Sequence, residues 1–103
     1  MIYRQGDLGI TPIKELPDNL KKVDNPILAY GEATGHHHKL LERTANQFEV
    51  LEDLAGNRYL KINQPTDLIH EEHQTITIKK GLYWVRNERE YNYFEMETQR
   101  VQD

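Results

Sequence analysis

The sequence predicts an all-β fold, a small single-domain barrel or sandwich of about seven to nine short strands. Segments that read as strands recur every ~8–12 residues, with turn-forming residues between them. The chain has 103 residues, the length of one domain. Residues 15–25 are rich in Pro, Asp and Asn, so they allow one helical turn but no long helix. We expect residues 1–96 to form the domain and residues 97–103 to form a polar C-terminal tail.

The individual strands are predicted from alternating polarity and from the turns that bound them. Ala55-Gly56-Asn57 predicts a hairpin loop, and Lys80-Gly81 predicts another turn. Pro12 has no amide hydrogen, so its strand is expected at a sheet edge or to end its pairing there. The expected strands are residues 8–13, 26–30, 36–43, 48–52, 59–62, 68–70, 75–79, 82–86 and 91–96.

Alternation at period two also predicts which side chains point into the core. In residues 36–43, one face carries His36, His38, Leu40 and Glu42, and we expect this face to point inward. His37 lies on the other face and is expected to point to solvent. Ile76 and Ile78 are expected on the core side of a later strand, and core positions are also expected for Phe48, Trp84 and Val85.

Composition limits the function classes. The net charge of −4 argues against non-specific binding to nucleic acid, which requires a basic surface. The chain has no cysteine, so any metal must take nitrogen and oxygen ligands. No signal peptide or membrane span is apparent, and we expect a soluble cytoplasmic protein. Only 37% of the residues are hydrophobic, so a homo-oligomer or a bound metal would help to stabilise the small core.

Two histidine-containing segments predict a metal site. The side chains of His36 and His38 lie on the same face of a strand, about 6.6 Å apart at the backbone. The segment His70-Glu71-Glu72-His73 supplies further imidazoles, and both reach one site only if the chain turns at the two glutamates. Such a site suits a divalent Zn, Fe, Mn or Ni ion, among which the sequence does not choose. The expected metal ligands are His36, His38, His70, His73 and Glu42.

The same residues allow catalysis by metal-assisted hydrolysis or related chemistry. Glu71 or Glu72 would accept a proton from metal-bound water, and Arg86, Arg89 and Tyr91 would line the mouth and bind a small-molecule or nucleotide substrate. Alternatively, the ligands close around a structural ion.

Two further alternatives involve no metal. His38 and His70 would act as base and acid in phosphodiester cleavage of RNA or a nucleotide, with Lys39 or Arg86 holding a phosphate. Alternatively, the domain is a non-catalytic accessory or phage protein that binds another protein through the sheet edges at residues 8–13 and 91–96.

The segment Gly31 to Glu42, with His36-x-His38 followed by Glu42, resembles the first motif of the cupins. The strand after Gly81 resembles a second cupin element. This resemblance implies a cupin-like or jelly-roll-like barrel in which two histidines, a glutamate and a third histidine hold a metal. The chain departs from the pattern because Tyr83 and Trp84 stand where a cupin places its third histidine. The histidine motifs and Arg89-Glu90-Tyr91 also resemble small uncharacterised bacterial or phage proteins, which implies no activity.

Overall fold

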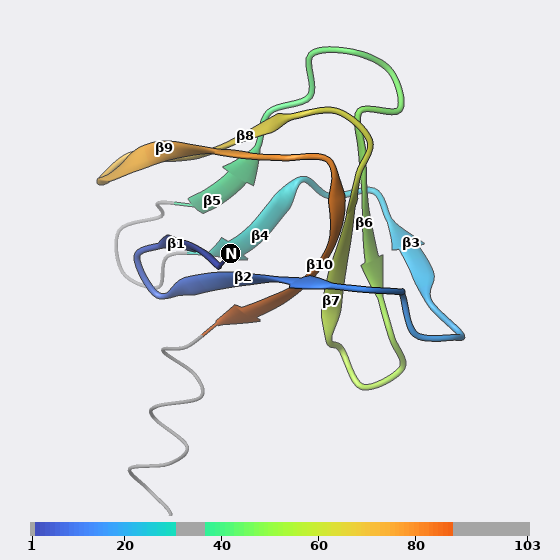
Figure 1. Cartoon of the computed structure of the whole chain (residues 1–103). Coiled ribbons are helices and arrows are strands. Elements are labelled where there is room, and N and C mark those ends of the chain that lie inside the picture. Colours follow the sequence, from blue (N-terminus) through green and yellow to red (C-terminus); the bar gives the residue numbers. More distant parts are fainter. Residues whose placement is uncertain (1, 31–36, 88–103) are drawn as a thin grey trace, which may run out of the picture.

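The computed structural model describes residues 2–30 and 37–87, and these ranges form an all-β fold (Figure 1). All strand pairs are antiparallel. The strands of the described ranges are β1 (Tyr3–Gln5), β2 (Leu8–Ile13), β3 (Lys21–Val23), β4 (Ile27–Tyr30), β5 (His37–Leu40), β6 (Phe48–Glu52), β7 (Arg58–Ile62), β8 (Thr66–His70), β9 (His73–Ile78) and β10 (Gly81–Asn87).

The strands form two sheets that pack around one core. The larger sheet has the order β1-β2-β10-β7-β6-β3, and the smaller sheet has the order β4-β5-β8-β9. β1 of the larger sheet is in contact with β9 of the smaller sheet. A hydrogen bond of 3.3 Å from the Lys79 amide to the Tyr3 hydroxyl links the sheets there. Within the described ranges no ladder closes the sheets into a complete barrel.

The core is made by the inward side chains of both sheets. Ile10, Leu60, Leu68 and Ile78 are all completely buried, and they come from four different strands. Removing this apolar surface from water is the main force that holds the sheets together. The remaining buried apolar residues are Leu8, Leu28, Leu40, Val50, Ile62, Tyr83 and Val85, and Phe48 and Ile76 pack against them.

Trp84 does not belong to this core, so the core position predicted for it is wrong. In β10, Tyr83 and Val85 are buried, and alternation places Trp84 between them on the opposite face. Trp84 is half-buried there, with the Arg86 guanidinium carbon 5.3 Å from its ring centroid. Its size and apolarity suggested burial, but the register of β10 decided its face.

The predicted strands from residue 8 to residue 86 correspond to β2 and to β4 through β10. Two strands were missed, β1 and β3, which have three residues each and lie next to turns. With ten strands described, the expected seven to nine was too few. The strand predicted at residues 91–96 and the tail at 97–103 lie outside the described residues.

The pairing of β2 corrects the prediction that residues 8–13 form a sheet edge available to a partner. This strand lies between β1 and β10. Its pairing with β1 extends only as far as Ile10, whereas Pro12 is paired with Tyr83 of β10. Pro12 therefore stands where one of the two ladders has ended, which is the second arrangement that the missing amide hydrogen predicts.

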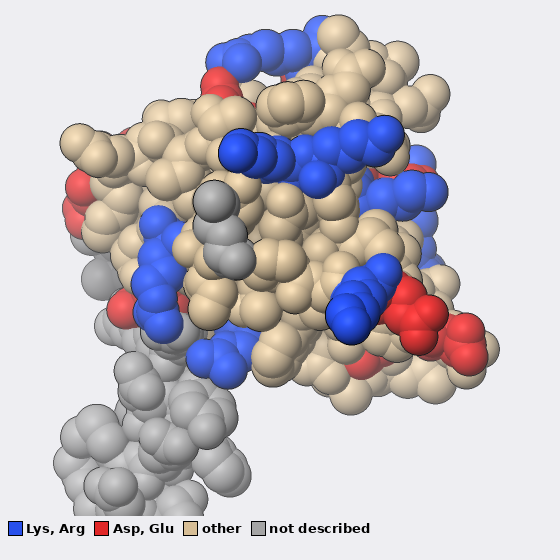
Figure 2. Space-filling model, in the orientation of Figure 1, with Lys and Arg blue, Asp and Glu red and all other residues tan. Residues whose placement is uncertain are grey.

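Charged side chains do not form one continuous basic surface in the view of Figure 2. Lys and Arg side chains are spread around a largely uncharged centre, and Asp and Glu side chains lie mainly toward the margins. Among the described residues, no helix has the length and apolar character needed to cross a membrane.

Candidate functional site

Three histidines from two neighbouring parts of the smaller sheet meet at its boundary with the larger sheet. His38 lies on the inward face of β5 and is 8% exposed, and the ring of His70 at the end of β8 lies 4.4 Å from it, centroid to centroid. His73 begins β9, and its ring lies 4.6 Å from that of His70 and 6.1 Å from that of His38. We call these three residues the histidine cluster.

The turn required for this arrangement is present at Glu71 and Glu72. β8 ends at His70, β9 begins at His73, and these two histidines are direct partners across the hairpin. On a continuous strand, residues three apart would point to opposite faces. The two-residue turn instead brings both rings to the same end of the hairpin, where β5 supplies His38.

A buried glutamine on β1 connects the cluster to the larger sheet. Gln5 is 3% exposed, and its side-chain oxygen lies 2.9 Å from Nδ1 of His38. Its side-chain nitrogen donates to the carbonyl oxygens of Leu68, at 2.7 Å, and Gln74, at 2.9 Å. All of its hydrogen-bonding groups therefore have partners, as burial requires.

The pKa of His38 is lowered from 6.5 to about 4. Burial is the largest cause, because it disfavours the charged imidazolium, and the nearby His70 and His73 add to the effect. Asp7 acts in the opposite direction but does not compensate. His38 is consequently a neutral imidazole at neutral pH, with one ring nitrogen that carries a lone pair.

The other two rings are held by backbone groups of the turns around them. The Glu72 amide donates a hydrogen bond of 3.0 Å to Nδ1 of His70. The ring of His73 lies against Gly6, in the turn between β1 and β2, where a Cβ atom would stand 2.6 Å from Nε2 of His73. Gly6 also has a φ of +60°, so this position favours glycine both by conformation and by space.

The structure places the remaining predicted site residues as follows. Glu71 and Glu72 are exposed in the turn of the cluster. Arg86 lies over Trp84, on the face of β10 opposite its core residues. The predicted roles of these residues stay predictions. His36, Arg89 and Tyr91 lie outside the described residues, and His37 is half-buried on the other face of β5.

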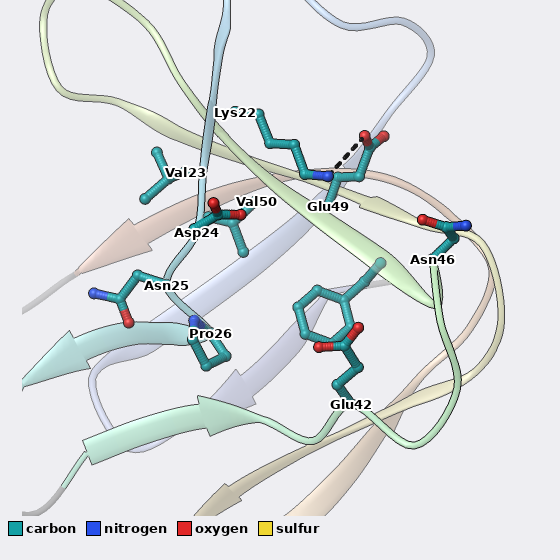
Figure 3. A pocket seen from close by; sticks show the side chains of 10 residues that line it. Lys22, Val23, Asp24, Asn25, Pro26, Glu42, Asn46, Glu49 and Val50 are labelled. Atoms are coloured by element: carbon teal, nitrogen blue, oxygen red, sulfur yellow. Dashed lines mark ion pairs between the residues drawn. The ribbon is translucent and has the colours of Figure 1, made fainter.

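Glu42 lines a separate cavity, which is formed by β3, β6 and the segments that join β3 to β4 and β5 to β6. The cavity has a volume of about 180 Å³, and Figure 3 shows the ion pair of 3.9 Å between Lys22 and Glu49 at its border. None of the three cluster histidines lines it. The lining residues are Lys22, Val23, Asp24, Asn25, Pro26, Glu42, Asn46, Phe48, Glu49 and Val50.

Only one pair of rings in the histidine cluster is stacked, and His70 is tilted by 37° to His38 and by 44° to His73. His38 and His73 are nearly parallel, with 9° between their planes. Among the residues that the structure describes, no group of three or more His, Asp or Glu side chains is arranged to hold a metal ion. A metal would therefore require the rings to turn.

Gln5 and Gly6 were not found by sequence reasoning. The only local signal is their position just before the strand predicted at residues 8–13, with a glycine as the turn residue. Glutamine is common on surfaces, so nothing local marks Gln5 as buried.

Comparison with known proteins identifies the family. No curated protein and no solved structure matches the chain. A family model described as a domain of unknown function, DUF8820, matches residues 4–88, which include the histidine cluster and Gln5. Because this match spans most of the chain, the protein belongs to the DUF8820 family.

Proposed function

We propose that the chain binds a divalent transition-metal ion through His38, His70 and His73. The observation that carries this proposal is the meeting of three imidazoles, from β5 and from both ends of the β8–β9 turn, with ring centroids 4.4–6.1 Å apart. Imidazole nitrogen is a ligand for zinc, iron, copper and nickel. Three protein ligands also leave a coordination position open for water or substrate.

The protonation state of His38 favours a metal over protons. Metal binding requires neutral imidazoles, so protons compete with the ion for the ligand nitrogens. The lowered pKa of His38 removes this competition at neutral pH. The two neighbouring histidines contribute to the shift because one more positive charge beside them is unfavourable.

Binding would require a local rearrangement of the β8–β9 turn. Nδ1 of His70 accepts the Glu72 amide hydrogen, so in the neutral ring the proton is on Nε2. To act as a ligand, His70 must give up this hydrogen bond, either because Nδ1 itself binds the metal or because the proton moves to Nδ1 and frees Nε2. His73 is exposed at the start of β9, and its ring would also have to turn, which changes its contacts with Gly6 and His38.

The likeness to the cupins enters as part of this proposal. In common with the cupin pattern, a histidine of the motif from Gly31 to Glu42 would hold the metal, together with histidines from another strand pair. The position after Gly81 is different. Tyr83 stands there, its hydroxyl donates to the Lys79 carbonyl at 2.7 Å, and burial raises its pKa to about 12. We therefore propose that this chain resembles the cupins in using histidines as metal ligands. The position of the cupins' third histidine, where Tyr83 stands, is not part of the proposed site.

Metal content tests the proposal directly. Protein purified without a histidine tag should contain a divalent metal, or should take up Zn²⁺ or Ni²⁺ after treatment with EDTA, with a rise in thermal stability. Saturation at 100 times Kd would stabilise the fold by about 2.7 kcal/mol. His38→Ala should abolish uptake. His37→Ala is the matched control, because it removes a neighbouring imidazole from the other face of β5.

Two outcomes of these measurements would contradict the proposal. If the wild-type protein contains no metal and none of Zn²⁺, Mn²⁺, Ni²⁺ and Fe²⁺ changes its thermal stability, the metal proposal is wrong. Equal uptake by the two histidine variants would also contradict the assignment of His38 as a ligand.

A second candidate function is favoured by the closeness of His38 and His70, whose ring centroids lie 4.4 Å apart. The neutral ring of His38 would accept a proton, and an imidazolium form of His70, which requires release of its Nδ1 from the Glu72 amide, would donate one. Such a pair can act as acid and base in phosphodiester cleavage without a metal. EDTA-treated protein should then hydrolyse a 2′,3′-cyclic nucleotide, and loss of this activity in EDTA would exclude the metal-free mechanism.

A further inference from the structure

We propose that Gln5 is the positioning residue of the histidine cluster and determines which ring nitrogen of His38 is offered to a ligand. This inference deepens the proposed metal site and depends on it for its functional meaning. The buried Gln5 side chain makes three hydrogen bonds, none of which the sequence predicts.

The orientation of the Gln5 amide follows from its two backbone partners. The carbonyl oxygens of Leu68 and Gln74 can only accept hydrogen bonds. The Gln5 atom that faces both of them, at 2.7 Å and 2.9 Å, must therefore be the side-chain nitrogen, which has two hydrogens to donate. The side-chain oxygen is then directed to His38 and cannot be exchanged with the nitrogen without leaving two carbonyls facing an oxygen.

The tautomer of His38 follows from that orientation. An amide oxygen only accepts hydrogen bonds, so Nδ1 of His38, 2.9 Å away, must carry the hydrogen. A neutral imidazole has one N–H group, which leaves the lone pair on Nε2. The donor atom that His38 presents to a metal is thus Nε2.

This arrangement has the chemistry of the outer shell of a metal site. A histidine ligand usually donates its second ring N–H to a carbonyl or carboxylate, which fixes the tautomer and the ring orientation. Gln5 supplies such a carbonyl without introducing a charge into a buried place. A carboxylate at this position would lack the two hydrogens that Leu68 and Gln74 require.

Gln5 also connects every strand that contributes to the cluster. Its partners lie on β5, β8 and β9, whereas Gln5 itself belongs to β1 of the larger sheet. One side chain therefore sets the position of the His38 ring relative to the hairpin that carries His70 and His73. This explains why a residue with no metal-binding group of its own belongs to the site.

The test compares two equally buried glutamines. Gln5→Met removes the amide and keeps much of the volume, and Gln47→Met makes the same change at a glutamine that is 4% exposed and hydrogen-bonds no histidine. Long-range ¹H–¹⁵N NMR spectra of EDTA-treated protein at neutral pH report which ring nitrogen carries hydrogen. Isothermal titration with Zn²⁺ alone reports affinity.

The expected results separate positioning from general stability. Wild-type protein and Gln47→Met should show His38 protonated on Nδ1. Gln5→Met should show a mixture of tautomers or mainly the Nε2–H form, and its Zn²⁺ affinity should fall by about 10-fold or more. The two variants should differ in tautomer and affinity even where they lose stability alike.

Opposite results overturn the inference. A wild-type spectrum with His38 protonated on Nε2 refutes the assignment even if Gln5→Met does not fold. An unchanged tautomer in a folded Gln5→Met variant refutes the role of Gln5. If wild-type His38 is protonated on Nδ1 but Zn²⁺ does not bind, the tautomer assignment is confirmed and the proposed metal site is the part that fails.

Discussion

Gln5 and Gln47, the two buried glutamines among the described residues, are nearly equally buried but have different hydrogen-bond partners. Gln47 precedes β6, and its oxygen accepts hydrogen bonds from the amides of Arg43 and Thr44. Its nitrogen donates to the Pro65 carbonyl and the Thr66 hydroxyl. These contacts hold loop backbone and the start of β8 in place, so they give Gln47 a structural role.

Gln5 satisfies backbone groups with its nitrogen but directs its oxygen to an imidazole. A histidine that is held in one tautomer, next to two further histidines, has a defined donor atom. Burial and saturated hydrogen bonds are common to both glutamines, so these properties do not separate them. What distinguishes Gln5 is the chemistry of its partner, an imidazole ring whose Nδ1–H group it accepts.

The largest expected effects come from replacing each glutamine with methionine. Each change removes the partner of several polar groups, which costs about 1–3 kcal/mol for each group that neither water nor another partner then reaches. We expect urea unfolding to show a loss of roughly 3 kcal/mol for Gln5→Met and roughly 2 kcal/mol for Gln47→Met, whose surroundings are more exposed. A neutral effect at either position would mean that water replaces the amide there.

The turn that follows Gln5 provides a second comparison, between two glycines with positive φ. A side chain in the left-handed region costs about 1–2 kcal/mol. Gly56→Ala, in a loop where a Cβ atom has nothing within 4 Å, should cost about 1 kcal/mol in urea unfolding.

Gly6→Ala should cost more, roughly 2–3 kcal/mol, because the new Cβ atom also displaces the ring of His73. It should also weaken Zn²⁺ binding, which Gly56→Ala should leave unchanged. Equal losses at the two glycines, with equal affinity, would show that His73 moves away freely and that Gly6 has no part in the cluster.

The burial of His38 predicts a dependence of stability on pH. Its pKa is about 4 in the folded protein and near 6.5 when exposed, so the unfolded chain binds a proton more readily. Stability should therefore fall as the pH decreases from 6.5 towards 4, by about 2 kcal/mol at pH 5. The measurement is urea unfolding at pH 7 and pH 5 in EDTA. His38→Gln should reduce this difference, and an unchanged difference would assign the pH dependence to other groups.

The smallest expected effect concerns the surroundings of Gln47. Arg43 makes an ion pair of 2.8 Å with Asp67, and the Arg43 side chain is 62% exposed. Such pairs contribute about 0–1 kcal/mol, so Arg43→Ala should lower the free energy of unfolding by roughly 0.5 kcal/mol. It should leave Zn²⁺ affinity unchanged. A change in affinity would mean that the two glutamine regions are coupled through β8, which links them.

The strands were readable from sequence because alternation and turn residues are local signals. Thr75 to Lys79 alternates clearly, and Ile78 is buried as expected. The sequence does not decide whether His70 pairs with His73, because residues three apart share a site only if the chain turns between them. Trp84 was misplaced because size and apolarity predict burial only on average, whereas the face is decided by register.

The sequence by itself determined the all-β class, most strands and the residue types available for a metal, with no thiolate among them. Alternation also determined that His38 points inward with Leu40. The tertiary structure decided that β1 lies beside β9, and hence that Gln5 meets His38 and Gly6 meets His73. These contacts join residues more than thirty positions apart. They depend on how two sheets pack, and no local pattern in the chain encodes that.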